Sequence, residues 1–309
     1  MAKKYTVLYI LFLIFFISSC NNKINTPAPS PTPVPSPSPA VDPNQKPLIL
    51  SCIPYASELK LTEGWQCLAD YLSAYMGIPV KFEMKKTYKP LVDGLKSGEI
   101  DFANTGPLIY VKAHDVAGAT PLVKPIPVSG KSPFYQSYII VRKDSGIKTI
   151  SQLKGKKFAF TDKESASGFL IPVLILTEAG VKDFKFFSDV LYTGDHDSSV
   201  SAFYNGYADG AGVSNYLFAK GTNERLVDLE VIKKSDPIPT APIVVRANMP
   251  PDVVKKIKEA FLSIDPDKKE NRYFLDLIQV KSYIEASDKE YEPIRKAAKA
   301  IEKMGFGTE

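Results

Sequence analysis

The sequence is poor in histidine and cysteine. Its 309 residues contain 2 His and 3 Cys, and the histidines, His114 and His196, lie far apart along the chain. No two cysteines form a C-x-x-C pair, so neither a multi-histidine metal site nor a disulfide-dense miniprotein is expected. A hydrophobic share of 44% is ample for a packed core and excludes disorder throughout the chain.

The chain also lacks a strong charge of either sign. Lys and Arg number 39 against 34 Asp and Glu, and residues 1–46 account for much of the excess. The remaining 263 residues carry 35 basic and 33 acidic side chains, a balance of +2. Because a near-neutral body offers no electrostatic surface to a polyanion, we expect no nucleic-acid partner.

The N-terminus has the pattern of an export signal. Two lysines precede an apolar run over residues 5–17, which is shorter than the about 20 residues that a membrane-spanning helix needs. The run ends in ISSC, which resembles a bacterial lipobox, so residues 1–20 are predicted to be a lipoprotein signal peptide and Cys20 the lipidated residue. An uncleaved anchor with an incidental cysteine is the alternative. Both interpretations place the body outside the cytoplasmic membrane.

Residues 21–46 are rich in proline that alternates with small residues. Such a segment favours extended polyproline II structure, at about 3.1 Å per residue, and predicts a stiff tether between the membrane and the body. A ligand for an SH3-type domain is the competing interpretation, which export makes unattractive.

The two remaining cysteines could form a disulfide. Cys52 closes the first predicted strand, Cys67 lies in the helix that follows, and export makes a bond chemically permitted. The bond would close a short loop and contribute roughly 3 kcal/mol in the chain-entropy model. Two buried thiols are the alternative, and the sequence leaves both open.

From residue 47 onward, short apolar runs alternate with amphipathic stretches. This alternation predicts α/β units on a mostly parallel sheet. Strands are expected at 48–53, 80–84, 100–103, 138–142 and 156–160, and helices at 63–76, 91–96, 108–114, 169–178, 251–261, 273–278 and 290–303.

The order of these segments predicts two lobes joined by two strands. Segments 134–142 and 238–246 could each cross between the lobes. A two-stranded hinge would allow the lobes to close around a cleft, which is a favoured place for a ligand. These crossings would divide the body into lobe one, residues 47–137 and 241–309, and lobe two, residues 138–240.

Residues 158–170 run from a predicted strand through a polar loop into a helix. A helix N-terminus has unpaired N–H groups and a partial positive charge, both of which favour anions. Ser165 and Ser167 add hydroxyl donors, and Gly168 removes side-chain bulk, so the loop could hold a tetrahedral oxyanion. A simple N-cap by either serine, with no ligand, is the alternative.

A second strand-to-helix turn carries His196 between Asp195 and Asp197. An imidazole beside two carboxylates tends to stay protonated, which would add a charged donor for an anion. A capping loop with a surface histidine is the plainer interpretation. A Ser-His-Asp hydrolase is a further alternative, but no G-x-S-x-G motif is present.

Several short landmarks lie along residues 47–265. They are Asp144-Ser145-Gly146-Ile147, Leu153-Lys154-Gly155-Lys156, Phe158-Ala159-Phe160, Ser165 to Phe169, Thr193-Gly194 with His196-Asp197, Asn205-Gly206 with Asp209, and Pro242-Ile243-Val244. In order and spacing they resemble the phosphonate/phosphite-binding family of ABC importers. The resemblance implies a type II periplasmic-binding fold, in which a ligand cleft lies between two α/β lobes.

The resemblance also implies ligand-binding residues. The family's phosphonyl-binding serine-threonine-serine loop falls on Ser165, Ala166 and Ser167, and its cleft histidine falls on His196. In lobe one the matching residues are Tyr88 at the start of the second helix, Thr105 after the third strand and, more loosely, Tyr55 after the first strand. As an alternative, Tyr55 and Tyr88 could pack at the rim without touching the ligand.

Two departures from the family pattern bear on the ligand. Ala166 lacks the hydroxyl of the family's threonine but keeps its N–H, and Ala241 stands where a carboxylate would hold an ammonium group. A buried ammonium without a carboxylate is costly. We therefore expect poor binding of aminoethylphosphonate and a preference for phosphite, a short alkylphosphonate or phosphate.

Together with the export signal, the resemblance implies a substrate-binding lipoprotein of an ABC importer, which is not an enzyme and needs no cofactor or metal. Its expected partners are the small oxyanion, the permease and, through the lipid, the cell membrane, and it is expected to be a monomer. A ligand sensor that presents its closed form to a receptor kinase is the first alternative. An extracellular hydrolase that uses His196 with a serine is the second.

Overall fold

The computed structural model describes residues 45–306, apart from residues 56, 131 and 220–227. The predicted signal peptide with Cys20, and nearly all of the predicted tether, lie outside the described residues. Within the part of the chain that is described, no helix is both long enough and apolar enough to cross a membrane.

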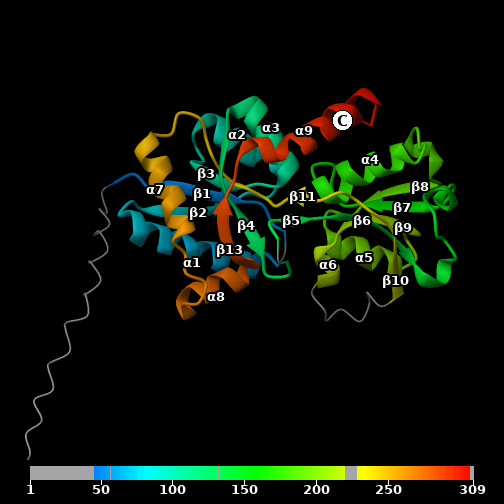
Figure 1. Ribbon diagram of the computed structural model, residues 1–309, viewed down its shortest axis with the longest axis horizontal. Coiled ribbons are helices and arrows are strands. Elements are labelled where there is room, and N and C mark those ends of the chain that lie inside the picture. Colours follow the sequence, from blue (N-terminus) through cyan, green and yellow to red (C-terminus); the bar gives the residue numbers. More distant parts are fainter. Residues whose placement is uncertain (1–44, 56, 131, 220–227, 307–309) are drawn as a thin grey trace, which may run out of the picture. The chain divides into compact units, whose positions relative to one another are not determined.

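The first sheet combines strands from both ends of the described chain (Figure 1). Its order is β13-β4-β12-β3-β1-β2. Strand β1 is parallel to β2 and β3, whereas β12 is antiparallel to β3 and β4, and β13 is antiparallel to β4. The strands are β1 (Leu48–Cys52), β2 (Val80–Met84), β3 (Phe102–Asn104), β4 (Thr120–Pro127), β12 (Ile243–Val245) and β13 (Val280–Glu285).

The second sheet has the order β10-β6-β9-β7-β8. Strand β7 is parallel to β8 and β9, and β6 is antiparallel to β9 and β10. Both sheets are therefore mixed, which corrects the expectation of a mostly parallel sheet. Parallel pairing normally requires a crossover connection, usually a helix. Strands β6 and β12 enter their sheets directly from the other lobe, without such a helix, and both pair antiparallel to their neighbours. The strands are β6 (Ser137–Arg142), β7 (Lys157–Phe160), β8 (Asp189–Tyr192), β9 (Gly210–Ser214) and β10 (Leu229–Lys234).

A short antiparallel pair joins the two lobes. Strand β5 (Phe134–Tyr135) pairs with β11 (Ile238–Pro239), as expected of a two-stranded hinge. The returning segment is held on both sides, because Thr240 Oγ1 donates to the Pro125 carbonyl at 2.8 Å and Tyr291 Oη donates to the Thr240 carbonyl at 2.8 Å. The chain thus has a two-lobed α/β fold.

The helices largely follow the predicted segments. Helix α1 begins five residues earlier than expected, at Glu58, and ends at Gly77, whose φ of 69° suits a residue without a side chain. The helices are α1 (Glu58–Met76), α2 (Tyr88–Ser97), α3 (Pro107–Ala117), α4 (Ile171–Glu178), α5 (His196–Tyr204), α6 (Tyr216–Ala219), α7 (Pro251–Leu262), α8 (Lys269–Leu277) and α9 (Glu292–Lys303), with a π-helical turn η3 (Ala166–Leu170) directly before α4.

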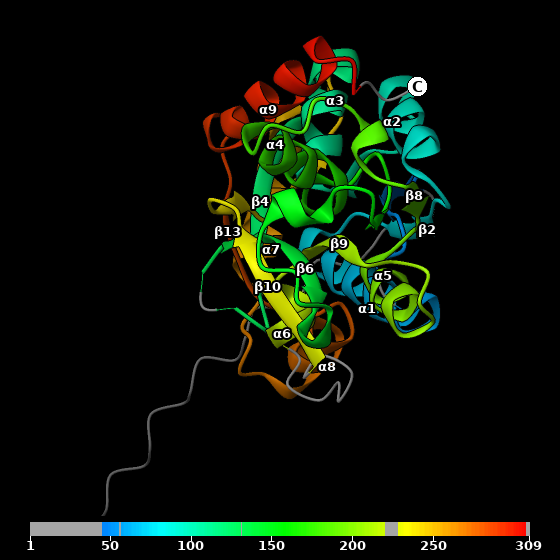
Figure 2. The same ribbon diagram turned by 90° about the vertical axis from the view of Figure 1, so that its right-hand side faces the viewer.

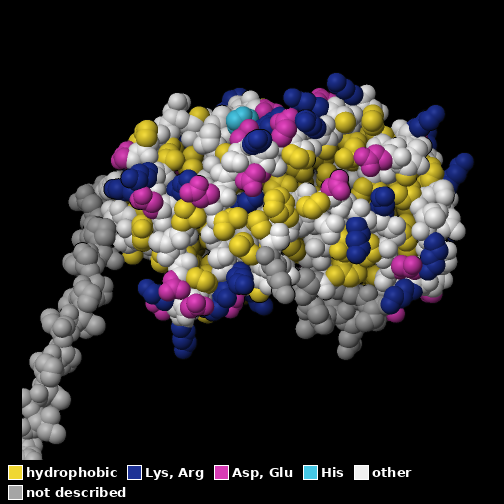
Figure 3. All heavy atoms as spheres, viewed as in Figure 1, with side chains coloured by type: hydrophobic (Ala, Val, Ile, Leu, Met, Phe, Trp, Pro, Cys, Tyr) yellow, Lys and Arg dark blue, Asp and Glu magenta, His cyan; other side chains and the backbone are white. Residues whose placement is uncertain are grey.

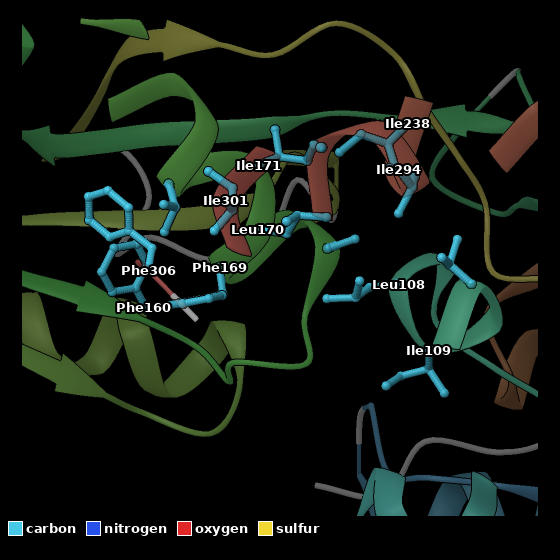
Figure 4. Packing of buried hydrophobic residues seen from close by; sticks show 14 of the residues in the cluster. Leu108, Ile109, Phe160, Phe169, Leu170, Ile171, Ile238, Ile294, Ile301 and Phe306 are labelled. Carbon is cyan, nitrogen blue, oxygen red and sulfur yellow. The ribbon is translucent and has the colours of Figure 1, made fainter. Parts of the chain in front are cut away.

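The largest hydrophobic cluster includes side chains from both lobes (Figure 4). Leu108 of α3 and Phe169 of η3 belong to it, together with Ile294 and Ile301 of α9. Helix α9 contacts α3, α4 and η3, and it lies beside α3 and α4 in the turned view (Figure 2). The last helix, which the sequence places in lobe one, therefore also packs against lobe two.

The surface carries charges of both signs in close mixture. Figure 3 shows Lys and Arg side chains interspersed with Asp and Glu over the visible face. This face has no extended basic area of the kind that binds nucleic acid.

Candidate functional site

The turn after β7 is built around a serine cap. Ser165 Oγ accepts from the Gly168 N–H at 3.0 Å, and the Ser165 carbonyl accepts from the amides of Phe169 and Leu170. Within the described part of the chain, no hydrogen bond engages the amides of Ala166 and Ser167, which are the first two of η3. The two residues are only 4% and 3% exposed. Two buried N–H donors therefore remain unpaired in this turn.

Gly168 allows β7 and the turn to approach closely. A Cβ atom at this position would lie 1.8 Å from Thr161 Oγ1, so any side chain would collide with the end of β7. The Thr161 N–H donates to the Gly168 carbonyl at 3.1 Å, which fixes this approach. Packing against β7 therefore requires glycine at this position. The sequence had suggested only that glycine leaves room for a ligand.

Ser167 is the residue at which several elements meet. Its Oγ lies 3.4 Å from His196 Nε2, and its carbonyl accepts from Ser137 Oγ on β6 at 2.7 Å. Burial raises the pKa of Tyr135, on the hinge strand β5, and the Ser167 side chain offsets part of that rise. The structure thus brings the serine loop and His196 together, as the resemblance implied.

His196 is oriented by β9. Its Nδ1 accepts from the Ser214 N–H at 3.2 Å, an arrangement that favours a neutral ring with its proton on Nε2, facing Ser167. This replaces the imidazolium that the sequence suggested. The neighbouring Asp195 carboxylate caps α5, because it accepts from both the N–H and the hydroxyl of Ser198 at 2.7 Å.

Lobe one reaches the serine loop through α2 and α3. Tyr88 packs against the hydrophobic cluster that contains Ala166 and Phe169 of the turn. Burial raises the pKa of Tyr88, and the Asp162 carboxylate raises it further, so the phenol stays protonated. Lys112 Nζ on α3 lies 2.6 Å from the Glu164 carboxylate, which belongs to the same loop. Of the three residues selected in lobe one, Tyr88 is the one placed close to this loop.

Thr105 and Tyr55 have their hydrogen bonds within lobe one. Thr105 Oγ1 donates to the Pro242 carbonyl at 3.3 Å. Tyr55 Oη donates to the Ile278 carbonyl at 3.1 Å and accepts from Trp65 Nε1 at 3.2 Å. None of the described hydrogen bonds joins either hydroxyl to the serine loop.

Two further tyrosines, Tyr135 and Tyr216, line this region and were not selected from the sequence. Their rings stack with centroids 5.1 Å apart and an interplanar angle of 21°. Tyr216 follows β9 directly, just as the serine loop follows β7 and His196 follows β8. Because these three strands are parallel, their carboxyl ends share one edge of the sheet, a position where ligands commonly bind. That rule, applied to the short apolar segment 211–213, could have identified Tyr216.

The two cysteines of the body are both free. The disulfide considered as one alternative for Cys52 and Cys67 is therefore not formed. Cys52 is fully buried in β1, whereas Cys67 lies beside the buried face of α1 and is partly exposed. Among the described residues, no group of three or more His, Cys, Asp or Glu side chains is placed to hold a metal ion.

Comparison with known proteins identifies the family. A family model described as "ABC transporter, phosphonate, periplasmic substrate-binding protein" matches residues 50–291. The phosphate-import protein PhnD of Mycolicibacterium smegmatis is 32% identical over 231 residues, which cover 69% of this chain and 70% of that protein. The phosphonates-binding periplasmic protein of Escherichia coli is 28% identical over 271 residues, or 84% of this chain and 78% of that protein.

Solved structures share the fold. PhnD1 of Prochlorococcus marinus in complex with methylphosphonate has a TM-score of 0.74 at 21% identity, covering 83% of this chain and 98% of that one. A binding-protein component of an ABC phosphonate transporter from Pseudomonas aeruginosa has a TM-score of 0.73 at 24% identity, covering 85% and 88% of the two chains. The chain belongs to the phosphonate family of periplasmic substrate-binding proteins of ABC transporters, which serve transport and are not enzymes.

Proposed function

We propose that this protein captures a small phosphorus oxyanion and delivers it to an ABC permease. The observation that carries the proposal is the pair of buried, unpaired amides at Ala166 and Ser167, beside Ser167 Oγ and His196 Nε2. Amides at the start of a helix favour an anion through both their hydrogens and the helix dipole. The relatives that are described as importing phosphate or as holding methylphosphonate support this ligand class.

The donors of lobe two are all uncharged. The two amides, the hydroxyls of Ser165 and Ser167 and the Nε2–H of His196 can each donate to an oxygen of the anion. Ser165 Oγ already accepts from Gly168, which leaves its own proton for the ligand. Such neutral donors hold a dianion through hydrogen bonds, which strengthen when the acceptor is charged.

Closure of the lobes would complete the site. Tyr88 is the residue of lobe one that we propose to contact the ligand, and the ion pair between Lys112 and Glu164 would hold α3 against the serine loop. Thr105 and Tyr55 would act indirectly, since their hydroxyls bind within lobe one. Expulsion of water on closure strengthens each hydrogen bond to the anion.

The ligand is proposed to be phosphite, a short alkylphosphonate or phosphate. Ala241, beside the fixed Thr240, offers no carboxylate to an ammonium group, which argues against aminoethylphosphonate. We further propose that Cys20 carries the lipid, that residues 21–46 act as the tether and that the protein works as a monomer. Replacement of Cys20 by alanine should then release the protein from the membrane fraction.

Isothermal titration of the protein with phosphate, phosphite, methylphosphonate, aminoethylphosphonate and sulfate tests the proposal. We expect at least one of the first three to bind, and aminoethylphosphonate to bind more weakly than methylphosphonate. The variants Ser167→Ala and His196→Ala should bind the ligand more weakly than the wild type does. Failure of every phosphorus oxyanion to bind would refute the function, and far tighter binding of aminoethylphosphonate would refute the argument from Ala241.

A further inference from the structure

Tyr216 carries a buried hydroxyl that has no hydrogen-bond partner among the described residues. Its N–H donates to Ser214 Oγ at 3.2 Å, and the Ser214 N–H in turn binds His196 Nδ1 at 3.2 Å. The same short turn after β9 therefore fixes the ring of His196 and the start of the helix that carries Tyr216. A polar group that is buried without a partner is unfavourable, so a ligand that pairs with it gains affinity.

The ring of Tyr216 packs beside the serine loop. It stacks on Tyr135 and lies against the hydrophobic cluster that contains both Tyr135 and Ala166. Burial raises the pKa of Tyr216, and the Tyr135 phenol adds to the rise, so Tyr216 remains protonated at neutral pH. It is therefore a hydroxyl that can both donate and accept near the ligand.

Tyr216 belongs to a different element than the serine loop does. The loop lies between β7 and α4, whereas Tyr216 begins α6 after β9. Phosphate, phosphite and methylphosphonate share three oxygens, for which the loop amides, the two serines and His196 supply enough donors. They differ in the fourth substituent, which is an oxygen, a hydrogen or a methyl group.

We propose that Tyr216 is a specificity-determining residue whose hydroxyl pairs with the fourth oxygen of phosphate, so that the site prefers phosphate to phosphite and methylphosphonate. The inference rests on the proposed function and narrows its ligand. A hydrogen or methyl group at the fourth position leaves the phenol unpaired, and sites with buried polar groups discriminate strongly against ligands that fail to pair with them.

The variant Tyr216→Phe tests this directly, because it removes the hydroxyl and keeps the ring that stacks on Tyr135. Titration of the full-length protein at pH 7 should give tighter binding of phosphate than of phosphite or methylphosphonate in the wild type. In the variant, the phosphate dissociation constant should rise about tenfold, or about 1.4 kcal/mol. The constants for phosphite and methylphosphonate should change less than about twofold.

Tyr283→Phe is the matched control. Tyr283, on β13 of lobe one, is the other tyrosine whose buried hydroxyl has no partner in the described part of the chain. Its removal should leave all three dissociation constants unchanged, and thermal unfolding should show that both variants fold.

Several results would overturn the assignment. Equal weakening of all three ligands by Tyr216→Phe would place the hydroxyl on a shared oxygen, and unchanged affinities would place it outside the site. Tighter binding of methylphosphonate than phosphate by the wild type would also contradict the stated preference. If the wild type bound none of the three, the proposed function itself would fail, which is a distinguishable outcome.

Discussion

Lobe two contains two strand-to-helix turns that look alike in sequence but differ at the helix start. In the turn before α5, the Asp195 carboxylate accepts from both the N–H and the hydroxyl of Ser198. In the turn before α4, the cap is the neutral Ser165, whose Oγ accepts from Gly168, and the amides of Ala166 and Ser167 stay buried without an acceptor in the described part of the chain.

The difference explains why one turn suits an anion and the other does not. A carboxylate from the chain already neutralises the start of α5, so a second anion there would be repelled. The start of η3 has a neutral cap and two amides that find no acceptor among the described residues, which makes an external anion favourable there. His196 belongs to the turn before α5, but its Nε2 lies near Ser167 of the turn before α4. The turn that is capped by a carboxylate therefore supplies a donor to the turn that is not.

The largest effect is expected from Gly168→Ala. The added Cβ would collide with Thr161 Oγ1 at 1.8 Å, which forces the serine loop away from β7. We predict at least a hundredfold loss of oxyanion affinity by titration, with destabilisation of about 1–3 kcal/mol. Gly64→Ala on α1 is the control, because its Cβ would also be crowded, at 2.8 Å from Ile278, but in lobe one.

Gly64→Ala should lower stability and leave oxyanion binding intact. The two variants therefore separate damage to the fold from damage to the loop. Wild-type affinity in a folded Gly168→Ala protein would show that the shape of this turn is irrelevant to binding.

Ser167→Ala and Ser198→Ala compare the two turns directly. Loss of a hydrogen bond to a charged group costs about 1.5–3 kcal/mol, so Ser167→Ala should weaken binding by about 10- to 100-fold. Ser198 Oγ binds Asp195 instead, and its removal should change affinity less than about twofold. Titration of both variants decides the comparison, and an equal loss in both would remove the distinction between the turns.

Breaking the ion pair between Lys112 and Glu164 should have a smaller effect on oxyanion affinity. Their side chains are 34% and 29% exposed, so screening limits the pair to about 1 kcal/mol. Lys112→Met or Glu164→Gln should weaken oxyanion binding about fivefold, and the double variant should lose little more than either single one. Lys89→Met, which breaks an exposed pair with Asp93 on α2, is the control and should bind normally.

Additive losses in the double variant would contradict a direct contribution of the pair. High salt offers an independent check, because it should reduce wild-type affinity toward that of the variants.

The smallest effect at neutral pH is that of tyrosine ionisation on folding stability. Burial raises the pKa of Tyr88, Tyr135 and Tyr216 above the ordinary value of 10.0. The unfolded chain therefore loses protons above about pH 10 while the folded protein keeps them, so stability should fall as pH rises beyond 10 and be unaffected below about pH 9. Denaturant unfolding between pH 8 and 11, with phenolate absorbance at 295 nm, measures this. Ionisation of every tyrosine near pH 10 in a protein that remains folded would contradict it.

The sequence predicts local features well because they depend on neighbouring residues. The strand, the polar loop and the glycine around Ser165 to Gly168 lie within one short segment, and β7 and α4 form close to their predicted places. The hinge was also recognisable from the two crossing segments, which pair as β5 and β11. The lipobox and the tether lie outside the described residues, so both remain predictions from the sequence alone.

Features that depend on distant partners were not visible in the sequence. Tyr135 and Tyr216 meet by stacking across 81 positions of the chain. The hydroxyl of Thr105 is taken by the Pro242 carbonyl, because β3 pairs with β12. The neighbours of His196 in sequence, two aspartates, predict a protonated ring. Its Nδ1 instead accepts from the Ser214 N–H on β9, a contact that the sequence does not show.

Amide chemical shifts of the isotopically labelled protein test the central claim most directly. On addition of phosphate, the N–H signals of Ala166 and Ser167 should move downfield and shift more than any others, because these buried donors gain a charged acceptor. The amides of Ser198 and Ser199, at the start capped by Asp195, should move little. If phosphate bound while the signals of Ala166 and Ser167 stayed in place, the serine turn would not be the anion site.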